Sequence, residues 1–120
     1  MSFKIPMTIA EVCDRFSICK LKNTRTDIDV SKELELLEKV ISSYSGLDVY
    51  IDQLTDINGS IWDLESDIRR GKEGSLGLEE VGRRALQIRN FNGMRVQCKN
   101  YINELHGEGF TEIKKNHASE

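Results

Sequence analysis

The sequence has little of what non-helical folds and membrane proteins require. One proline in 120 residues argues against a sandwich or barrel full of turns and favours long helices. No apolar stretch approaches the ~18 to 20 residues of a membrane span. The formal net charge is only -3, and its mixed signs create no uniform field for nucleic acid or an anionic membrane. We therefore expect neither a membrane nor a nucleic-acid partner.

Cysteine is also scarce. Cys13, Cys19 and Cys98 are odd in number, have no Cys-x-x-Cys spacing and lie near no histidine cluster, so neither a disulfide framework nor a zinc site is expected. We expect three reduced core residues, no metal and no cofactor. Residues 1–7 lack the charged-then-apolar order of a signal peptide, which predicts a cytoplasmic location.

The length and the apolar periodicity predict one all-α domain over residues 1–120. Thr8 and Glu11 have capping-box spacing at the start of the first helix. An extended lead-in is expected at 1–7 because of Pro6, and a loosely ordered tail at 108–120. Helices are predicted over residues 8–22, 31–46, 47–70 and 78–106.

The third predicted helix has the clearest pattern. Its apolar residues alternate by fours and threes, as in a helix that packs along another helix: Tyr50, Leu54, Ile57, Ile61, Leu64 and Ile68. The fourth continues the rhythm with Val81, Ala85 and Ile88. A short glycine-containing loop between them predicts an antiparallel, coiled-coil-like hairpin, packed with the two N-terminal helices as a bundle. Leu64 should lie near Ala85, and Ile61 near Ile88.

The apolar stripe of the fourth helix then shifts. It continues at Phe91, Met94, Cys98, Ile102 and Leu105, whereas strict continuation would turn Asn92, Arg95 and Lys99 inward. Asn58-Gly59 and Asn92-Gly93 are hairpin-turn dipeptides, but their flanks do not alternate, so we place both inside helices. The two glycines are expected to allow close approach within the hairpin or, alternatively, to act as a hinge.

Residues 61–69 read Ile-Trp-Asp-Leu-Glu-Ser-Asp-Ile-Arg. This segment is similar to the signature Leu-Trp-Asp-Ile-Glu-Asp-x-Ile-Arg of an uncharacterised helical family of bacteria and phages, domain of unknown function 6165. Residues 8–22 resemble its opening segment, and residues 92–103 its Asn-Asp-x-Arg-x-x-x-Lys-x-x-Ile-Asn pattern. The chain departs from the family at Gly59 and Gly93, where relatives tend to have helix formers. The resemblance implies a helical architecture and no established activity.

An acidic flank of the third helix is a candidate site. Asp63 and Asp67 repel each other one turn apart. Glu65 has Arg69 four residues on, but Asp63 has no cation at helical spacing. We expect its partner across the hairpin, among Arg83, Arg84 and Arg89, in a structural salt-bridge network. A divalent-metal site is the alternative.

Two further candidates involve the hairpin helices. Trp62 lies off the seam and should anchor another helix or subunit, or alternatively provide a stacking platform for a base or sugar. Asn92, Arg95 and Lys99 share a face and would form either a buried polar network that fixes register or an anion pocket. Asn58 joins these candidates as a ligand-binding or polar-network residue.

These features favour a non-enzymatic interaction or assembly module, a homo-oligomer through apolar helix faces. The alternative is a small metal-dependent hydrolase, such as a MazG-type nucleotide pyrophosphohydrolase, or a protein that binds an anionic ligand. The acidic pairs Glu11-x-x-Asp14 and Glu35-x-x-Glu38 occur in the reverse of the order typical of that enzyme. Neither a phosphate-binding loop nor a triad is visible, so whether the protein is an enzyme stays open.

Overall fold

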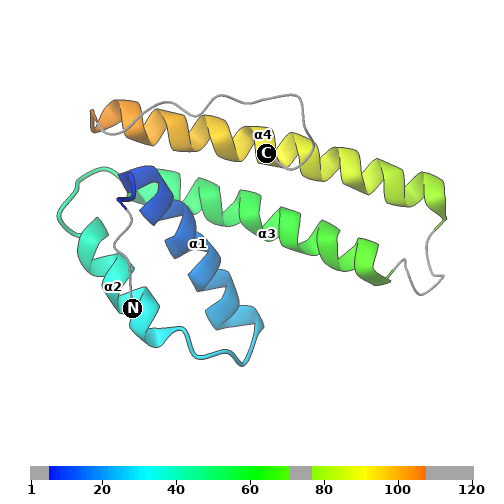
Figure 1. Ribbon diagram of the computed structural model, residues 1–120, viewed down its shortest axis with the longest axis horizontal. Coiled ribbons are helices and arrows are strands. Elements are labelled where there is room, and N and C mark those ends of the chain that lie inside the picture. Colours follow the sequence, from blue (N-terminus) through cyan, green and yellow to red (C-terminus); the bar gives the residue numbers. More distant parts are fainter. Residues whose placement is uncertain (1–5, 71–76, 108–120) are drawn as a thin grey trace.

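The computed structural model describes residues 6–70 and 77–107, and every regular element in these ranges is an α-helix (Figure 1). This confirms the all-α prediction. The expected tail at 108–120 and residues 1–5 of the expected lead-in lie outside the described residues. The helices are α1 (Ile9–Arg25), α2 (Ser31–Ile41), α3 (Asp48–Arg70) and α4 (Leu78–Leu105).

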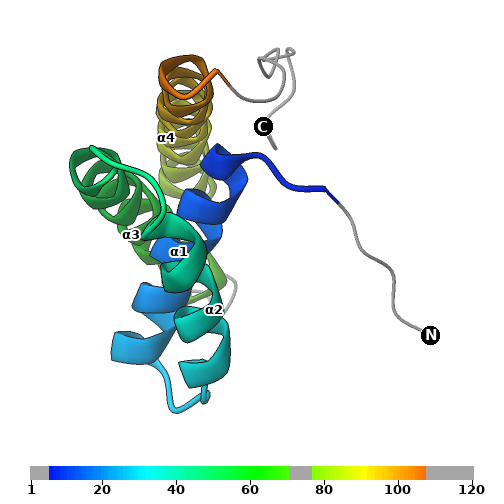
Figure 2. The ribbon, with the colours of Figure 1, turned by 90° about the vertical axis from the view of Figure 1, so that its left-hand side faces the viewer.

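The two longest helices, α3 and α4, run antiparallel beside each other, as predicted (Figure 1). The first helix crosses one side of this pair and contacts both members, and α2 packs against α1. An end-on view shows α1 between α2 and the hairpin (Figure 2). Among the described residues, no helix lies against the opposite side of the hairpin. None of the described helices is long and apolar enough to cross a membrane.

Local sequence signals explain where the helices begin and end. Thr8 caps α1 as predicted, because its hydroxyl accepts a hydrogen bond from the backbone N–H of Glu11 at 3.3 Å. The second helix ends at Ile41 rather than near residue 46. Ser42 and Ser43 direct their hydroxyls to the carbonyls of Lys39 and Val40, and this local bonding competes with helix continuation.

Glycines follow two of the helices with positive φ angles. Gly46 has a φ of 75°, and Gly107, which follows the C-cap residue His106 of α4, has a φ of 63°. A residue without a Cβ adopts this left-handed conformation with little strain. The predicted stop at Gly107 is therefore confirmed, and the Asn58-Gly59 and Asn92-Gly93 pairs lie inside α3 and α4 as predicted.

The core lies where α1 crosses the hairpin. Most of its buried side chains come from α1, from the start of α3 and from the end of α4, among them Ile9, Ala10, Cys13, Ile51, Leu54, Cys98 and Ile102. All three cysteines are buried and unbridged, as the prediction of core residues required. Leu54 and Ile61 of the predicted seam are buried too.

The seam prediction is wrong for part of α4. Ala85 is exposed, whereas its neighbour Arg84 reaches across the hairpin and places its Nε 3.5 Å from a carboxylate oxygen of Asp67. A long arginine side chain can cover apolar surface while its charge meets an acidic group. The inward residue of this turn is therefore Arg84 rather than Ala85, while Val81 and Ile88 of the predicted seam are half-buried.

Candidate functional site

A row of polar side chains on α4 faces α1. Asn92, Arg95, Lys99 and Asn103 are spaced by three or four residues and so share one side of the helix. Asn92, Lys99 and Asn103 are buried, and the Arg95 side chain is 28% exposed. The inward side of α4 therefore includes the positions of strict continuation together with Cys98 and Ile102 of the shifted stripe, which are buried too. The shifted stripe is wrong as an inward face for Met94 and Leu105, which are exposed.

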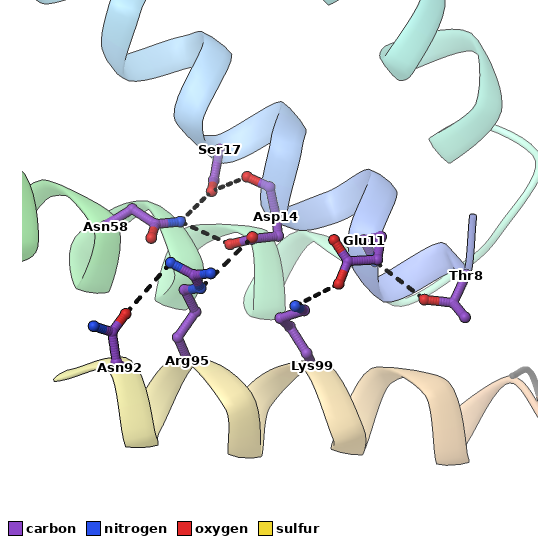
Figure 3. Close-up of polar contacts among 8 residues, drawn as sticks. All are labelled: Thr8, Glu11, Asp14, Ser17, Asn58, Asn92, Arg95 and Lys99. Carbon is purple, nitrogen blue, oxygen red and sulfur yellow. Dashed lines mark hydrogen bonds and ion pairs between the residues drawn. The ribbon is translucent and has the colours of Figure 1, made fainter. Parts of the chain in front are cut away.

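The first helix supplies complementary groups to this row (Figure 3). The Lys99 ammonium lies 2.5 Å from the Glu11 carboxylate, and Arg95 Nε lies 3.6 Å from Asp14 Oδ2. At the end of the row, Asn103 Oδ1 accepts a hydrogen bond from the backbone N–H of Ala10 at 3.2 Å. An amide near the start of α1 has no partner within its own helix, so Asn103 acts as a tertiary cap.

The third helix completes the network with Asn58. Its Nδ2 donates to Asp14 Oδ1 at 2.9 Å and to Ser17 Oγ at 2.8 Å. The Ser17 hydroxyl donates in turn to the backbone carbonyl of Asp14 at 2.6 Å. Asp14, Ser17 and Asn58 are all buried. A single carboxylate therefore links α1 to both helices of the hairpin.

The charges of this network balance. Glu11 and Asp14 supply two carboxylates, and Arg95 and Lys99 supply two cations at pairing distance. The buried charges of Asp14 and Lys99 each face a group of opposite charge, which offsets the cost of their burial. An anion held by Asn92, Arg95 and Lys99 would have to compete with carboxylates that already neutralise both cations. The arrangement thus has the properties of a polar network that fixes how α1 docks.

The acidic flank of α3 is paired differently from the prediction. Asp63 forms its ion pair with Arg25 of α1 at 2.9 Å, so the expected partner among Arg83, Arg84 and Arg89 is wrong. Arg25 also reaches the carbonyl of Gly59 at 3.4 Å. A Cβ on Gly59 would lie 3.3 Å from Arg25 Nη2, so this glycine faces α1, and its expected role inside the hairpin is wrong too.

The other acidic candidates do not join Asp63. Asp67 pairs with Arg84 and Arg70, each at 3.5 Å, while Glu65 is exposed beside a cavity on another side of α3. In the described part of the chain, no three side chains of the histidine, cysteine, aspartate and glutamate types gather where they could hold a metal ion. The structure therefore does not bring the acidic flank together as one site.

Trp62 packs toward α1, as the anchor interpretation predicted. The Arg25 guanidinium carbon lies 5.7 Å from the centre of its ring, within cation–π distance. Trp62 also lines a cavity of about 350 Å³, which we call the inner pocket. Its walls come from α1, α3 and α4: Ile18, Leu21, Asn58, Ile61, Trp62, Glu65, Arg69 and Arg95.

A second cavity, of about 660 Å³, lies on the side of the hairpin away from α1. We call its lining the open face: Val49, Tyr50, Gln53, Asp56, Ile57, Met94, Gln97, Cys98 and Tyr101. Val49, Met94 and Tyr101 are 62%, 49% and 56% exposed. The rings of Tyr50 and Tyr101 lie 5.5 Å apart across the groove. Sequence reasoning did not identify this groove, although it did note surplus apolar residues.

The cysteines near the network are poor nucleophiles. Burial, with smaller effects from Cys98 and the Asp14 carboxylate, raises the pKa of Cys13 to about 12. Burial also raises the pKa of Cys98. Reactivity requires the thiolate, so both side chains behave as packing residues at neutral pH.

Sequence reasoning missed Glu11, Asp14, Ser17 and Asn103 as network members and Arg69 as a pocket residue. The available signal was the polar pair Glu11 and Asp14 among apolar neighbours of α1. No protein-family model, curated protein or solved structure matches this chain. The family resemblance noted above stays a prediction.

Proposed function

We propose that the protein is a non-enzymatic helical assembly module that binds a second copy of itself through the open face. The observation that carries this proposal is the apolar groove between α3 and α4 on the side away from α1. A helical hairpin that is apolar on both sides needs cover on both sides. The first helix covers one side only.

The spacing of residues on α4 supports a helical partner. Met94, Cys98, Tyr101 and Leu105 follow one another by four, three and four residues, the repeat of a helix–helix seam. Met94, Tyr101 and Leu105 are each about half exposed. The fourth helix therefore has two seams: a polar one that meets α1, and an apolar one that contacts α3 through Cys98 and Tyr101 and is otherwise largely exposed.

The chemistry of the open face favours an identical copy. Asp56 is the only charged residue in the groove lining. The surface therefore has too little charge to favour a partner with a strongly positive face. Gln53 and Gln97 can each donate and accept hydrogen bonds, which suits a surface that meets itself about a two-fold axis. Two hairpins packed in this way would form a four-helix arrangement.

The size of the face suits a modest interface. Residues 91 to 105 span about 20 Å of helix axis, and two neighbouring helices are about 20 Å wide. Such a footprint corresponds to an interface at or below the usual ~800 Å² per partner. We therefore expect a dimer with a micromolar dissociation constant, rather than an obligate one.

The test compares two glutamate variants of α4 by light scattering at about 100 µM protein. Met94 and Leu86 are both large apolar residues of α4, with exposed fractions of 49% and 59%. Only Met94 lines the groove. The wild type and Leu86→Glu should have twice the mass of the 13.7 kDa chain, and Met94→Glu should be monomeric. A monomeric wild type, a dimeric Met94→Glu, or dissociation caused by Leu86→Glu alone would each contradict the proposal.

A further inference from the structure

The inner pocket is built differently from the open face. It lies on the α1 side of the hairpin, and residues of three helices line it. Its volume of about 350 Å³ is at the lower end of the ~300–1,000 Å³ typical of small-molecule sites. A ligand of this size is smaller than most nucleotide cofactors.

One wall of the inner pocket is apolar and contains a fixed aromatic ring. Ile18, Leu21 and Ile61 line the pocket together with Trp62. The Trp62 ring contacts Arg25, which is itself held by Asp63. These contacts hold the ring in place before any ligand arrives, which lowers the entropic penalty of binding.

Two arginines bring positive charge to the lining of the inner pocket. Arg69 donates to Ser66 at 3.2 Å, and no carboxylate among the described residues forms an ion pair with it. Arg95 is held loosely: its contacts to Asp14 and Asn92 are 3.6 and 3.4 Å, and its Nε has no hydrogen-bond partner. Both arginines line the pocket.

The charge of the pocket limits what it can bind. Arg95 faces the Asp14 carboxylate at 3.6 Å and Glu65 carries one negative charge, so Arg69 is the one lining cation without a carboxylate partner among the described residues. Arginine recognises carboxylates through a planar pair of donors. The Glu65 carboxylate disfavours ligands with several negative charges, such as nucleoside triphosphates.

We propose that the inner pocket binds a small aromatic monocarboxylate. The ring of the ligand lies against Trp62, and its carboxylate pairs with Arg69, whose printed contact is to the Ser66 hydroxyl. This inference is independent of the assembly function, because the lining of the inner pocket includes α1 and shares no residue with the open face.

Trp62 supplies the readout, because it is the only tryptophan in the chain. Its indole N–H gives a single signal in ¹H–¹⁵N spectra. Phenylacetate is the probe, phenylacetamide its neutral counterpart and phenyl phosphate its more highly charged counterpart. Phenylacetate should shift the indole signal saturably. The affinity of phenylacetamide should be lower by a factor of about ten or more, since it lacks the charge-assisted hydrogen bonds.

A pair of arginine variants locates the site. Arg69 and Arg89 are both exposed, so neither substitution should prevent folding, and only Arg69 lines the pocket. Arg69→Ala should weaken phenylacetate binding about tenfold, whereas Arg89→Ala should leave it unchanged. No saturable shift below ~10 mM, equal binding of the amide, or an unaffected Arg69→Ala would overturn the inference. Tighter binding of phenyl phosphate would overturn the choice of a monocarboxylate.

Discussion

Replacing Asp14 and Asn58 by alanine, singly and together, measures how strongly the polar network holds α1 on the hairpin. The two side chains form a 2.9 Å hydrogen bond in the interior. Arg25 and Asp63 form a contact of the same length, but the Asp63 side chain is 68% exposed. The second pair is therefore a matched control for the effect of burial.

The expected magnitudes follow from the environments of the two pairs. A buried hydrogen bond to a charged group contributes about 1.5–3 kcal/mol, whereas an exposed ion pair contributes about 0.2–1 kcal/mol. Asn58→Ala also removes the bond to Ser17 and leaves the Asp14 carboxylate buried with fewer partners, so this variant should lose about 3 kcal/mol in total. The coupling free energy should be about 2 kcal/mol for Asp14 with Asn58 and about 0.5 kcal/mol for Arg25 with Asp63.

Urea unfolding followed by circular dichroism provides the four free energies of unfolding that each cycle needs. If the free energy of unfolding falls with urea concentration at the same slope in every variant, the variants unfold as the wild type does. A coupling below about 0.5 kcal/mol for the buried pair, or equal couplings for the two pairs, would refute the conclusion that the network holds α1 in a dry interior.

Three other changes have defined outcomes. Gly59→Ala should raise the free energy of unfolding by up to ~1 kcal/mol, because the added Cβ meets the flexible end of Arg25; a loss of stability in thermal melts would show that Arg25 cannot move. Native Cys13 should resist iodoacetamide at pH 8, since a pKa of about 12 keeps the thiol protonated, and rapid labelling in mass spectra would contradict this. Magnesium or manganese should leave the melting temperature unchanged, because Arg25 already engages Asp63. A saturable increase that Asp63→Asn abolishes would instead indicate a metal site.

Sequence patterns predicted the helices well because those signals are local. The period of Leu54, Ile57 and Ile61 predicted the buried side of α3, and Thr8 and Gly107 were recognised from capping chemistry alone. These features depend on residues within a few turns of each other. They therefore need no knowledge of how the helices pack.

The pairings between helices were harder to predict because they depend on where α1 docks. Matching positions along the two antiparallel helices placed Asp63 beside an arginine of α4. Its partner in the structure is instead Arg25 of α1, which lies 38 positions away in sequence. Asn92, Arg95 and Lys99 were recognised as one face, but their acidic partners on α1 were not. A polar face is buried only if a complementary polar helix covers it, and no pattern within α4 reveals that cover.

Isotope-filtered nuclear Overhauser spectroscopy on a mixture of labelled and unlabelled protein tests the assembly proposal most directly. Two copies packed through the open face should give cross-peaks from the Met94 methyl group of one copy to the Tyr101 ring and Val49 methyl groups of the other. Absence of any intermolecular cross-peak at about 1 mM, well above the micromolar dissociation constant expected for an interface of this size, would contradict the proposal. So would cross-peaks confined to another exposed apolar residue, such as Leu36 of α2.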